Sequence, residues 1–351
     1  MKKKSLNVKN KIHKRVLNYL NNKRIFKIYK ELELSLFSKD RFAVALSGGP
    51  DSLALAFVAK CFSILNKIDI KYYLVDHKLR KESSQEAKKV FLLLKKFNIH
   101  CKILTWQGMK PKSNIQAIAR NKRYSLLINQ CKKDKINYLA LGHHSDDVYE
   151  NFLIRLLRGS GLKGLTSFGK NSEYKQNEVK LLRPFINLDK KDLIFLSNKV
   201  FNFYVEDPSN LNNNFKRIRI RKLIQVLVDE GLDKKKLSLT IDNLKDSDRT
   251  IKFYIDNNIK VNSIFSKKNN TFLLNKSFFQ QPNEVIFRSI STLMNSISKN
   301  YYSARGKSVT NLIIRIKSKN FKKTTLGRCF FQKINQTILI SPENYTKDKV
   351  L

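Results

Sequence analysis

One short segment of the sequence combines residue types that bind phosphate. It directly follows the apolar run 42–46 and consists of Ser47, Gly48, Gly49, Pro50, Asp51 and Ser52. A strand that ends in glycines and then starts a helix aims backbone N–H groups and a helix N-terminus at one point. A generic glycine turn is the alternative, but we predict an anion site here. On this hypothesis a side chain added at Gly48 occupies phosphate space and leaves the fold intact.

Two adjacent aspartates form the second candidate for chemistry. Asp146 and Asp147 follow His143 and His144, directly after a predicted strand at 138–142. Two carboxylates near a phosphate repel one another unless a divalent cation lies between them and the ligand. The pair therefore predicts Mg²⁺. Capping of a helix explains one aspartate but not both, and a zinc site lacks further soft ligands nearby.

Two further pairs of residues are weaker candidates. Asp76 and His77 end the second predicted strand, where they could meet a base edge or a phosphate. Asp76 could instead cap the following helix. Arg120 and Arg123 lie about one helical turn apart and could clamp phosphates, although a solvated helix face has the same pattern.

The charge balance indicates a polyanionic partner. The 351 residues include 70 Lys and Arg against 28 Asp and Glu, a formal net charge of +42. A biased composition explains part of the lysine content but not the shortage of acids, so we expect nucleic acid. The densest basic segment is 216–222, and its cations are Lys216, Arg217, Arg219, Arg221 and Lys222. We expect a phosphate backbone to relieve their mutual repulsion.

Other classes are disfavoured by what the sequence lacks. The four cysteines form no C-x-x-C pair, so neither zinc nor an iron–sulfur cluster is expected. No apolar run is long enough to span a membrane, and the first thirty residues lack the apolar core of a signal peptide. We expect a cytoplasmic protein without a membrane partner.

Alternating apolar and helical segments predict an α/β fold with a doubly wound, mostly parallel sheet. Its expected strands are 42–46, 71–75, 100–105, 138–142 and 181–186. Three helical segments follow at 189–203, 215–230 and 234–255, and a small α+β region ends in a hairpin-like pair. We predict four parts, namely an N-terminal extension at 1–37, a catalytic domain at 38–205, a helical appendage at 206–260 and a C-terminal domain at 261–351.

Taken in order, the motifs resemble one family, tRNA(Ile)-lysidine synthetase. The resemblance covers about residues 40 to 225 and rests on SGGPDS at 47–52, VDHKLR at 75–80, AR-x-x-RY at 119–124, HHSDD at 143–147, RGSGLKGL at 158–165, RPF at 183–185 and EDPSN at 206–210. It implies a PP-loop, Rossmann-like ATP pyrophosphatase. Two positions depart from the family pattern, because Lys78 stands where members often have glycine and Asn151 where they often have threonine.

The resemblance implies a ligase that forms a carbon–nitrogen bond. Its substrates would be ATP with Mg²⁺, free lysine and the isoleucine tRNA with a CAU anticodon, and AMP and pyrophosphate would be released through an adenylated cytidine. It assigns residues 47–52 to the ATP phosphates, Asp76 and His77 to adenosine, Asp146 and Asp147 to magnesium or lysine activation, Arg120 and His143 to the reacting phosphate, and Arg217, Arg219, Arg221 and Lys222 to tRNA.

Two other functions stay open at this point. A cytidine thiolase of the same superfamily would need C-x-x-C sulfur chemistry that the cysteines here do not offer. A non-catalytic RNA-binding protein would keep the basic segment but would not require Asp146 and Asp147. Whether the chain forms a homodimer is also open.

Overall fold

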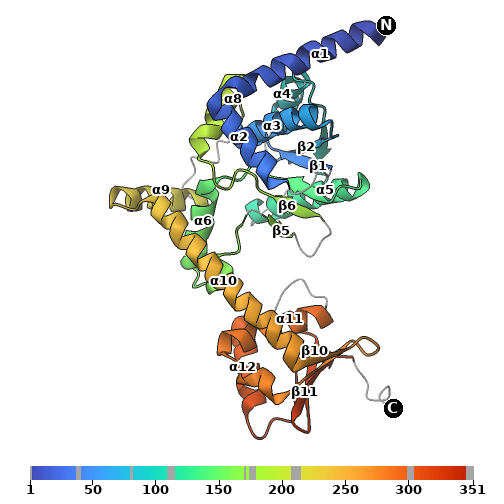
Figure 1. The fold of residues 1–351 in the computed structure, drawn as a ribbon, viewed down its shortest axis with the longest axis vertical. Coiled ribbons are helices and arrows are strands. Elements are labelled where there is room, and N and C mark those ends of the chain that lie inside the picture. Colours follow the sequence, from blue (N-terminus) through green and yellow to red (C-terminus); the bar gives the residue numbers. More distant parts are fainter. Residues whose placement is uncertain are drawn as a thin grey trace. The chain divides into compact units, whose positions relative to one another are not determined.

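The computed structural model describes residues 2–36, 41–79, 82–108, 115–169, 171–173, 179–206, 215–298 and 304–344. These residues form two compact units, Met1–Ser238 and Leu239–Leu351 (Figure 1). The boundary between the units falls inside the segment 206–260, so the four-part division stays a prediction. Among the described helices, none is long and apolar enough to cross a membrane.

The first unit is built on a six-stranded sheet whose strands have the order β3-β2-β1-β4-β6-β5. The strands are β1 Phe42–Leu46, β2 Lys71–Asp76, β3 Cys101–Thr105, β4 Tyr138–Ala140, β5 Asn171–Glu173 and β6 Lys180–Leu182. All neighbours pair in parallel except β5, which runs antiparallel to β6. The predicted doubly wound, mostly parallel sheet is confirmed. Only the edge strand β5 was not expected from the sequence.

Helices surround this sheet. They are α1 Lys2–Asn18, the 3-10 turn η1 Tyr19–Asn21, α2 Lys23–Ser35, α3 Pro50–Asn66, α4 Ser83–Lys95, α5 Ile115–Lys133, α6 Ser145–Leu156, α7 Leu162–Leu165, α8 Lys190–Phe201 and α9 Lys216–Asp229. Helix α10, Lys234–Asn262, continues from the first unit into the second. The predicted helices of this unit are therefore present, with ends that differ by a few residues.

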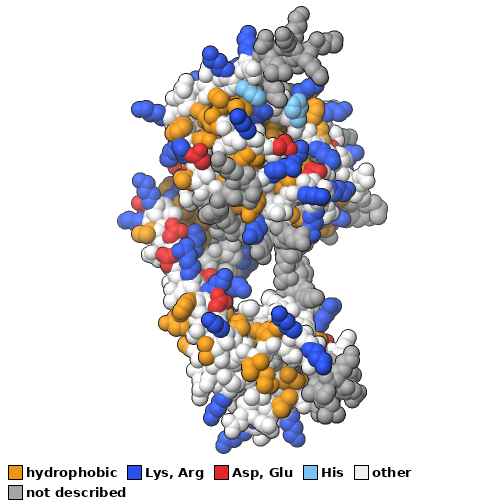
Figure 2. All heavy atoms as spheres, turned by 45° about the vertical axis from the view of Figure 1, so that its right-hand side comes forward, with side chains coloured by type: hydrophobic (Ala, Val, Ile, Leu, Met, Phe, Trp, Pro, Cys, Tyr) orange, Lys and Arg blue, Asp and Glu red, His pale blue; other side chains and the backbone are white. Residues whose placement is uncertain are grey.

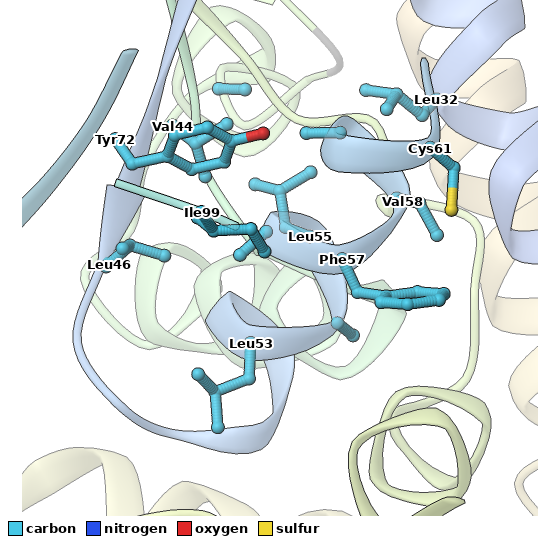
Figure 3. Packing of buried hydrophobic residues seen from close by; sticks show 14 of the residues in the cluster. Leu32, Val44, Leu46, Leu53, Leu55, Phe57, Val58, Cys61, Tyr72 and Ile99 are labelled. Atoms are coloured by element: carbon cyan, nitrogen blue, oxygen red, sulfur yellow. The ribbon is translucent and has the colours of Figure 1, made fainter. Parts of the chain in front are cut away.

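Both faces of β1 are covered, which is why its sequence is a continuous apolar run. Phe42, Val44 and Leu46 join a core cluster with residues of α2, α3, α4 and α8. Figure 3 shows part of this packing, in which side chains of α3 meet those of the neighbouring strands. Ala43 belongs to a separate cluster on the opposite face, where α5 packs. The helices thus hold β1 between two apolar layers.

The strand order creates a crevice at one edge of the sheet. Through α3 and α4 the chain moves from β1 to β2 and β3, and α5 then carries it back to β4 on the other side of β1. The connections therefore leave the carboxyl ends of β1 and β4 in opposite directions. Ligands of open α/β sheets bind at such a point.

The second unit has a five-stranded antiparallel sheet of order β7-β8-β11-β10-β9. Its elements are β7 Ser263–Ser266, β8 Thr271–Leu274, η3 Lys276–Gln280, α11 Asn283–Ser298, α12 Gly306–Lys317, β9 Lys323–Leu326, β10 Cys329–Ile334 and β11 Thr337–Pro342. Apolar faces of α11 and α12 pack on this sheet. The predicted small α+β region is confirmed, and residues 267–270 form the turn between β7 and β8.

Candidate functional site

The loop after β1 is held in shape by its two serines. The Ser52 hydroxyl accepts hydrogen bonds from the Ser47 N–H at 3.2 Å and from the Ser47 hydroxyl at 3.3 Å, and it donates to the Gly49 carbonyl at 3.0 Å. Helix α3 then begins at Pro50, so the N-terminal N–H groups of this helix face the crevice. The loop therefore has the local geometry, a turn followed by a helix N-terminus, on which the predicted anion site depends.

The two glycines of this loop have different surroundings. Gly48 has a φ of +85°, and a Cβ atom there would lie 2.9 Å from Val90 and 3.0 Å from Val205. The expectation that a side chain at Gly48 would occupy phosphate space and leave the fold intact is therefore wrong, because it would meet protein. At Gly49 the nearest atom to an added Cβ would be the Ser47 hydroxyl at 3.8 Å. Gly49 is therefore the glycine at which an added Cβ would meet no tight contact, and it lines the smaller cavity.

A third glycine, which the sequence analysis did not single out, brings the second motif to this loop. A Cβ atom at Gly142 would lie 2.8 Å from the backbone oxygen of Asp51. The end of β4 therefore lies directly against the first turn of α3, which only glycine permits. This contact places His143 and His144 beside the loop. The sequence signal was a glycine between an apolar strand and two histidines.

Two adjoining cavities open at the carboxyl edge of the sheet. One measures about 590 Å³ and the other about 350 Å³. Both are bordered by Ser47, Glu86, Arg123 and Val205. The larger is also lined by Asp76, His77, Arg120 and Arg217, and the smaller by Gly49, Pro50, Asp51, Ser52, His143, His144, Asp147 and Arg221. The structure thus brings most of the predicted site residues together.

Three arginines, Arg120, Arg123 and Arg217, line the larger cavity. Arg120 lies over the ring of Tyr124 at 5.0 Å and donates to its hydroxyl at 3.3 Å. Burial lowers the pKa of Arg123, and the positive charges of Arg120 and Arg217 act in the same direction, while Tyr124 opposes them. Like charges that are crowded in this way favour a polyanionic ligand.

Asp76 both lines the larger cavity and holds the loop that follows β2. One carboxylate oxygen accepts from the Lys78 N–H at 3.0 Å and the other from the Ser84 hydroxyl at 2.6 Å. These bonds go to a loop N–H and to a side-chain hydroxyl of α4, so the alternative that Asp76 caps the following helix stays a prediction. The Asp76 side chain also reaches the cavity wall. Lys78 has a φ of +48°. A left-handed backbone explains why glycine suits this position in the family that the sequence resembles.

The smaller cavity contains two carboxylates on either side of one imidazole. The His144 Nε2 atom lies 3.7 Å from Asp51 and 3.8 Å from Asp147. One oxygen of Asp51 is buried and has no hydrogen-bond partner among the described residues. Burial raises the pKa of Asp51, against the attraction of His144 and Lys190, and the negative charge of Asp147 raises it further. This pair of carboxylates suits a bound cation.

Burial and neighbouring charges make His143 neutral and Asp147 ionised at pH 7. Burial lowers the pKa of His143 to about 3, against the attraction of Asp147, and Arg183 acts in the same direction as burial. His143 is therefore neutral at pH 7. Burial raises the pKa of Asp147, but the neighbouring imidazoles, the His144 N–H at 3.1 Å and Arg217 outweigh this effect and lower it. Asp147 is ionised at pH 7.

The structure separates the two adjacent aspartates. Asp146 pairs with Lys234 at 2.9 Å and does not line either cavity, whereas Asp147 lines the smaller one. Adjacent positions on a helix point about 100° apart, which the sequence pattern alone did not take into account. The predicted metal pair therefore does not converge on one point.

Helix α9 contributes two of its cations to the site. Arg221 pairs with the buried Glu150 at 2.5 Å, and Arg217 lies 3.8 Å from Asp147 and 4.0 Å from Glu150. Burial raises the pKa of Glu150, although Arg221 opposes this shift. The sequence analysis places these cations in a helical appendage at 206–260, but Arg217 and Arg221 line the cavities at the carboxyl edge of the sheet.

The remaining predicted cations of α9 lie elsewhere on the helix. Arg219 and Lys222 are exposed and line neither cavity. Residues 217 and 221 are about one turn apart on α9, and residues 147 and 150 are about one turn apart on α6. This similar spacing was the sequence signal that the two arginines could pair with the two acids. Of the motif at 206–210, Glu206 is exposed and residues 207–210 lie outside the described residues.

Arg183 is a site residue whose role the sequence analysis did not identify. Its guanidinium donates to the Gly169 carbonyl at 2.9 Å and lies over the ring of Phe168 at 4.6 Å. The same ring contacts His143 edge to face at 5.4 Å. Arg183 and Phe168 therefore help to position the imidazole.

Comparison with known proteins supports this reading of the fold and the motifs. A family model described as a PP-loop domain matches residues 16–227. Among solved structures, the U34-tRNA thiolase NcsA from Methanococcus maripaludis superimposes with a TM-score of 0.53. The superposition covers 63% of this chain and 79% of the thiolase, at 18% identity. At that identity the likeness concerns the fold alone.

Three curated relatives share one name, tRNA(Ile)-lysidine synthase. The protein of Orientia tsutsugamushi is 36% identical over 60% of this chain and 46% of its own length. That of Wolbachia pipientis wMel is 30% identical over 88% of this chain and 72% of its own length. That of Rickettsia typhi is 31% identical over 92% and 76%, respectively. The match thus spans less than half of the Orientia relative but about three quarters of the other two. This chain belongs to the tRNA(Ile)-lysidine synthase family of PP-loop proteins.

Proposed function

We propose that this protein joins free lysine to C2 of the wobble cytidine in the isoleucine tRNA with a CAU anticodon. The oxygen on C2 attacks the α-phosphate of ATP, and pyrophosphate leaves. The lysine ε-amine then attacks C2, loses a proton, and AMP departs with that oxygen. The observation that carries the proposal is the pair of adjoining cavities, because the base must reach the α-phosphate of ATP and the amine must then reach C2 of that base.

ATP is assigned to the larger cavity and the loop beside it. A volume of about 590 Å³ is in the range of sites for ligands of this size. The N–H groups of Gly48 and Gly49, and those of Asp51 and Ser52 at the N-terminus of α3, hold the pyrophosphate end. Arg120, Arg123 and Arg217 neutralise phosphate charge, and Asp76 with His77 lies at the adenosine end.

Magnesium fits the carboxylates of the smaller cavity. Asp51 and Asp147 face one imidazole there, and one oxygen of Asp51 has no hydrogen-bond partner among the described residues. The described residues contain no group of three or more side chains that could hold a metal. Mg²⁺ commonly takes one or two carboxylates and completes its shell with phosphate oxygens and water. When bound, it would neutralise charge on the departing pyrophosphate. We therefore assign Asp51, in place of Asp146, as the partner of Asp147.

The charge states of the same residues suit the transfer steps. His143 is neutral at pH 7 because of its burial, so it can donate one hydrogen bond to the reacting phosphate without a charge. Asp147 is ionised and can accept a hydrogen bond from the lysine ε-amine, which orients that amine for its attack on C2. Arg120 supplies positive charge from the adjoining cavity. Donors fixed in advance stabilise charge that develops during the reaction.

The test uses the purified full chain with ATP, Mg²⁺, lysine and an unmodified tRNA transcript that carries the CAU anticodon. Mass spectrometry of the digested nucleosides should show cytidine heavier by one lysine minus water, with AMP and pyrophosphate formed in equal amounts. The methionine tRNA, which has the same anticodon, is the control and should stay unmodified. An unchanged cytidine, or one that has gained sulfur instead, would overturn the proposal.

A further inference from the structure

The outer face of helix α4 carries a stripe of four lysines. Lys88, Lys89, Lys95 and Lys96 are all exposed, and Leu92 at their centre is 59% exposed. Positions three, four and seven apart fall on one side of a helix, so these five residues share one face. The opposite side of α4 packs into the core through Ala87, Val90 and Leu94.

No carboxylate of the described residues pairs with any of these four lysines. The acids of the same segment, Glu82 and Glu86, lie at the start of the helix. Cations at a helix C-terminus interact favourably with the helix dipole, which accounts for Lys95 and Lys96 but not for Lys88 and Lys89. The repulsion within the stripe is therefore not balanced by the protein's own acids.

Helix α1 adds a fifth cation to this stripe. The Arg15 guanidinium donates to the Lys96 carbonyl at 3.2 Å and lies over the ring of Phe97 at 5.4 Å. Its side chain is thus held at the end of α4. The sequence of α1 contains no acid, and Lys11 and Lys14 on it are also exposed. We call Arg15, Lys88, Lys89, Lys95 and Lys96 the α4 patch.

The α4 patch lies away from the candidate site. Ser83, Glu86, Ala87 and Val90 line the larger cavity from the side of α4 opposite to the lysines, and the helix then runs toward the amino edge of the sheet. Lys95 is about 18 Å farther along the axis than Ser83, from a rise of about 1.5 Å per residue. A nucleotide or base bound in the cavity therefore cannot account for the patch.

We propose that the α4 patch is a second RNA surface, which binds the phosphate backbone without reading the sequence. Lysines without carboxylate partners bind phosphates as point charges. A membrane-surface helix would present a face of Trp, Phe or Leu, and this face has one leucine. On the side of the molecule shown in Figure 2, Lys and Arg side chains are spread widely. The proposal goes beyond the ligation and does not depend on it.

The experiment measures binding of an RNA hairpin that lacks a CAU loop, by fluorescence anisotropy across a KCl series and without ATP or lysine. The test variant replaces Lys88, Lys89, Lys95 and Lys96 with Gln. The matched control replaces Arg24, Lys30, Arg41 and Lys71 with Gln, which removes the same charge from cations that each have a carboxylate partner. Thermal melting confirms that both variants are folded.

We measure the slope of the logarithm of the binding constant against the logarithm of the KCl concentration. In the test variant its magnitude should fall by about 2 to 3 units, at roughly 0.7 to 0.9 per phosphate contact, and in the control it should change by less than about 1. Equal slopes for the two variants would overturn the proposal, since total charge alone would then explain binding. The proposal would also be overturned if the test variant lost binding to phosphatidylserine vesicles but kept its binding to the hairpin, because the patch would then bind a membrane surface. Because the hairpin is not a ligation substrate, this result is independent of the one for the proposed function.

Discussion

The carboxyl edge of the sheet and the outer face of α4 are both basic, but their cations are held in different ways. At the carboxyl edge, Arg217 and Arg221 are half-buried and face carboxylates of α6, one of them 1% exposed. On α4, the lysines are exposed and have no carboxylate partner among the described residues. The comparison teaches that the cations of a basic segment can pair with the protein's own carboxylates or stay available to an external polyanion. The burial of each cation and its partners distinguish the two cases.

The largest expected effect concerns the ion pair at the carboxyl edge. Arg221→Gln leaves the buried Glu150 with only Arg217 nearby, at 4.0 Å, so we expect a loss of about 2 to 3 kcal/mol in the free energy of unfolding. This is less than the ~3–5 kcal/mol typical of fully buried pairs, because 38% of the Arg221 side chain is exposed. Urea denaturation at pH 7 measures the loss. Lys95→Gln, the matched change on α4, should alter stability by less than about 0.5 kcal/mol.

The loss in Arg221→Gln should also depend on pH. Burial already raises the pKa of Glu150, and without the arginine that pKa rises further. A raised carboxyl pKa destabilises the fold above that pKa and ceases to do so once the pH falls below the unfolded value. The difference from the parent should therefore be larger at pH 8 than at pH 5. A Glu150→Gln/Arg221→Gln double variant should recover part of the loss, and a larger loss at low pH would contradict this account of the pair.

The two loop glycines test whether a position contacts the protein or the ligand, because Gly48 is packed against other side chains and Gly49 is not. Gly48→Ala places a Cβ against Val90 and Val205 at a positive φ, so we expect about 1 to 2 kcal/mol of destabilisation. Gly49→Ala should change stability by less than about 0.5 kcal/mol but weaken ATP binding, because its Cβ would meet no tight contact and would lie at the wall of the smaller cavity. Thermal melting and nucleotide titration separate the two effects. A destabilised Gly49→Ala with unchanged ATP affinity would refute the assignment of the loop.

Much of the fold could be predicted from the sequence because its signals are local. The run at 42–46, the glycines and Pro50 define a strand, a turn and a helix without reference to the rest of the chain. The edge strand β5 carries no such signal, because Asn171–Glu173 is polar and short. The order of motifs then brought most site residues to one edge, since parallel strands share their carboxyl ends.

The parts of the site that could not be predicted depend on contacts between distant segments. Nothing in the sequence near Gly48 indicates that Val205 fills the space beside it. Likewise, Lys234 and Asp146 are far apart in the chain, and their pairing appears only when α10 approaches α6. The aspartate pair was interpreted as one unit because the two residues are adjacent, yet each belongs to a different environment.

The smallest expected effect separates these two aspartates. Asp147→Asn removes a cavity carboxylate, while the amide oxygen can still accept the His144 N–H that caps α6, so the fold should be kept. If Asp147 holds Mg²⁺, the Mg²⁺ concentration that gives half-maximal pyrophosphate release should rise about tenfold in this variant. That rise is equivalent to roughly 1.4 kcal/mol for one lost carboxylate. Asp146 is the matched control, because it pairs with Lys234 and lies outside both cavities. Asp146→Asn should therefore leave the magnesium titration unchanged. An equal shift in both variants would mean that the pair acts together after all, and that the carboxyl edge recognises cations through its summed charge, not through Asp51 and Asp147.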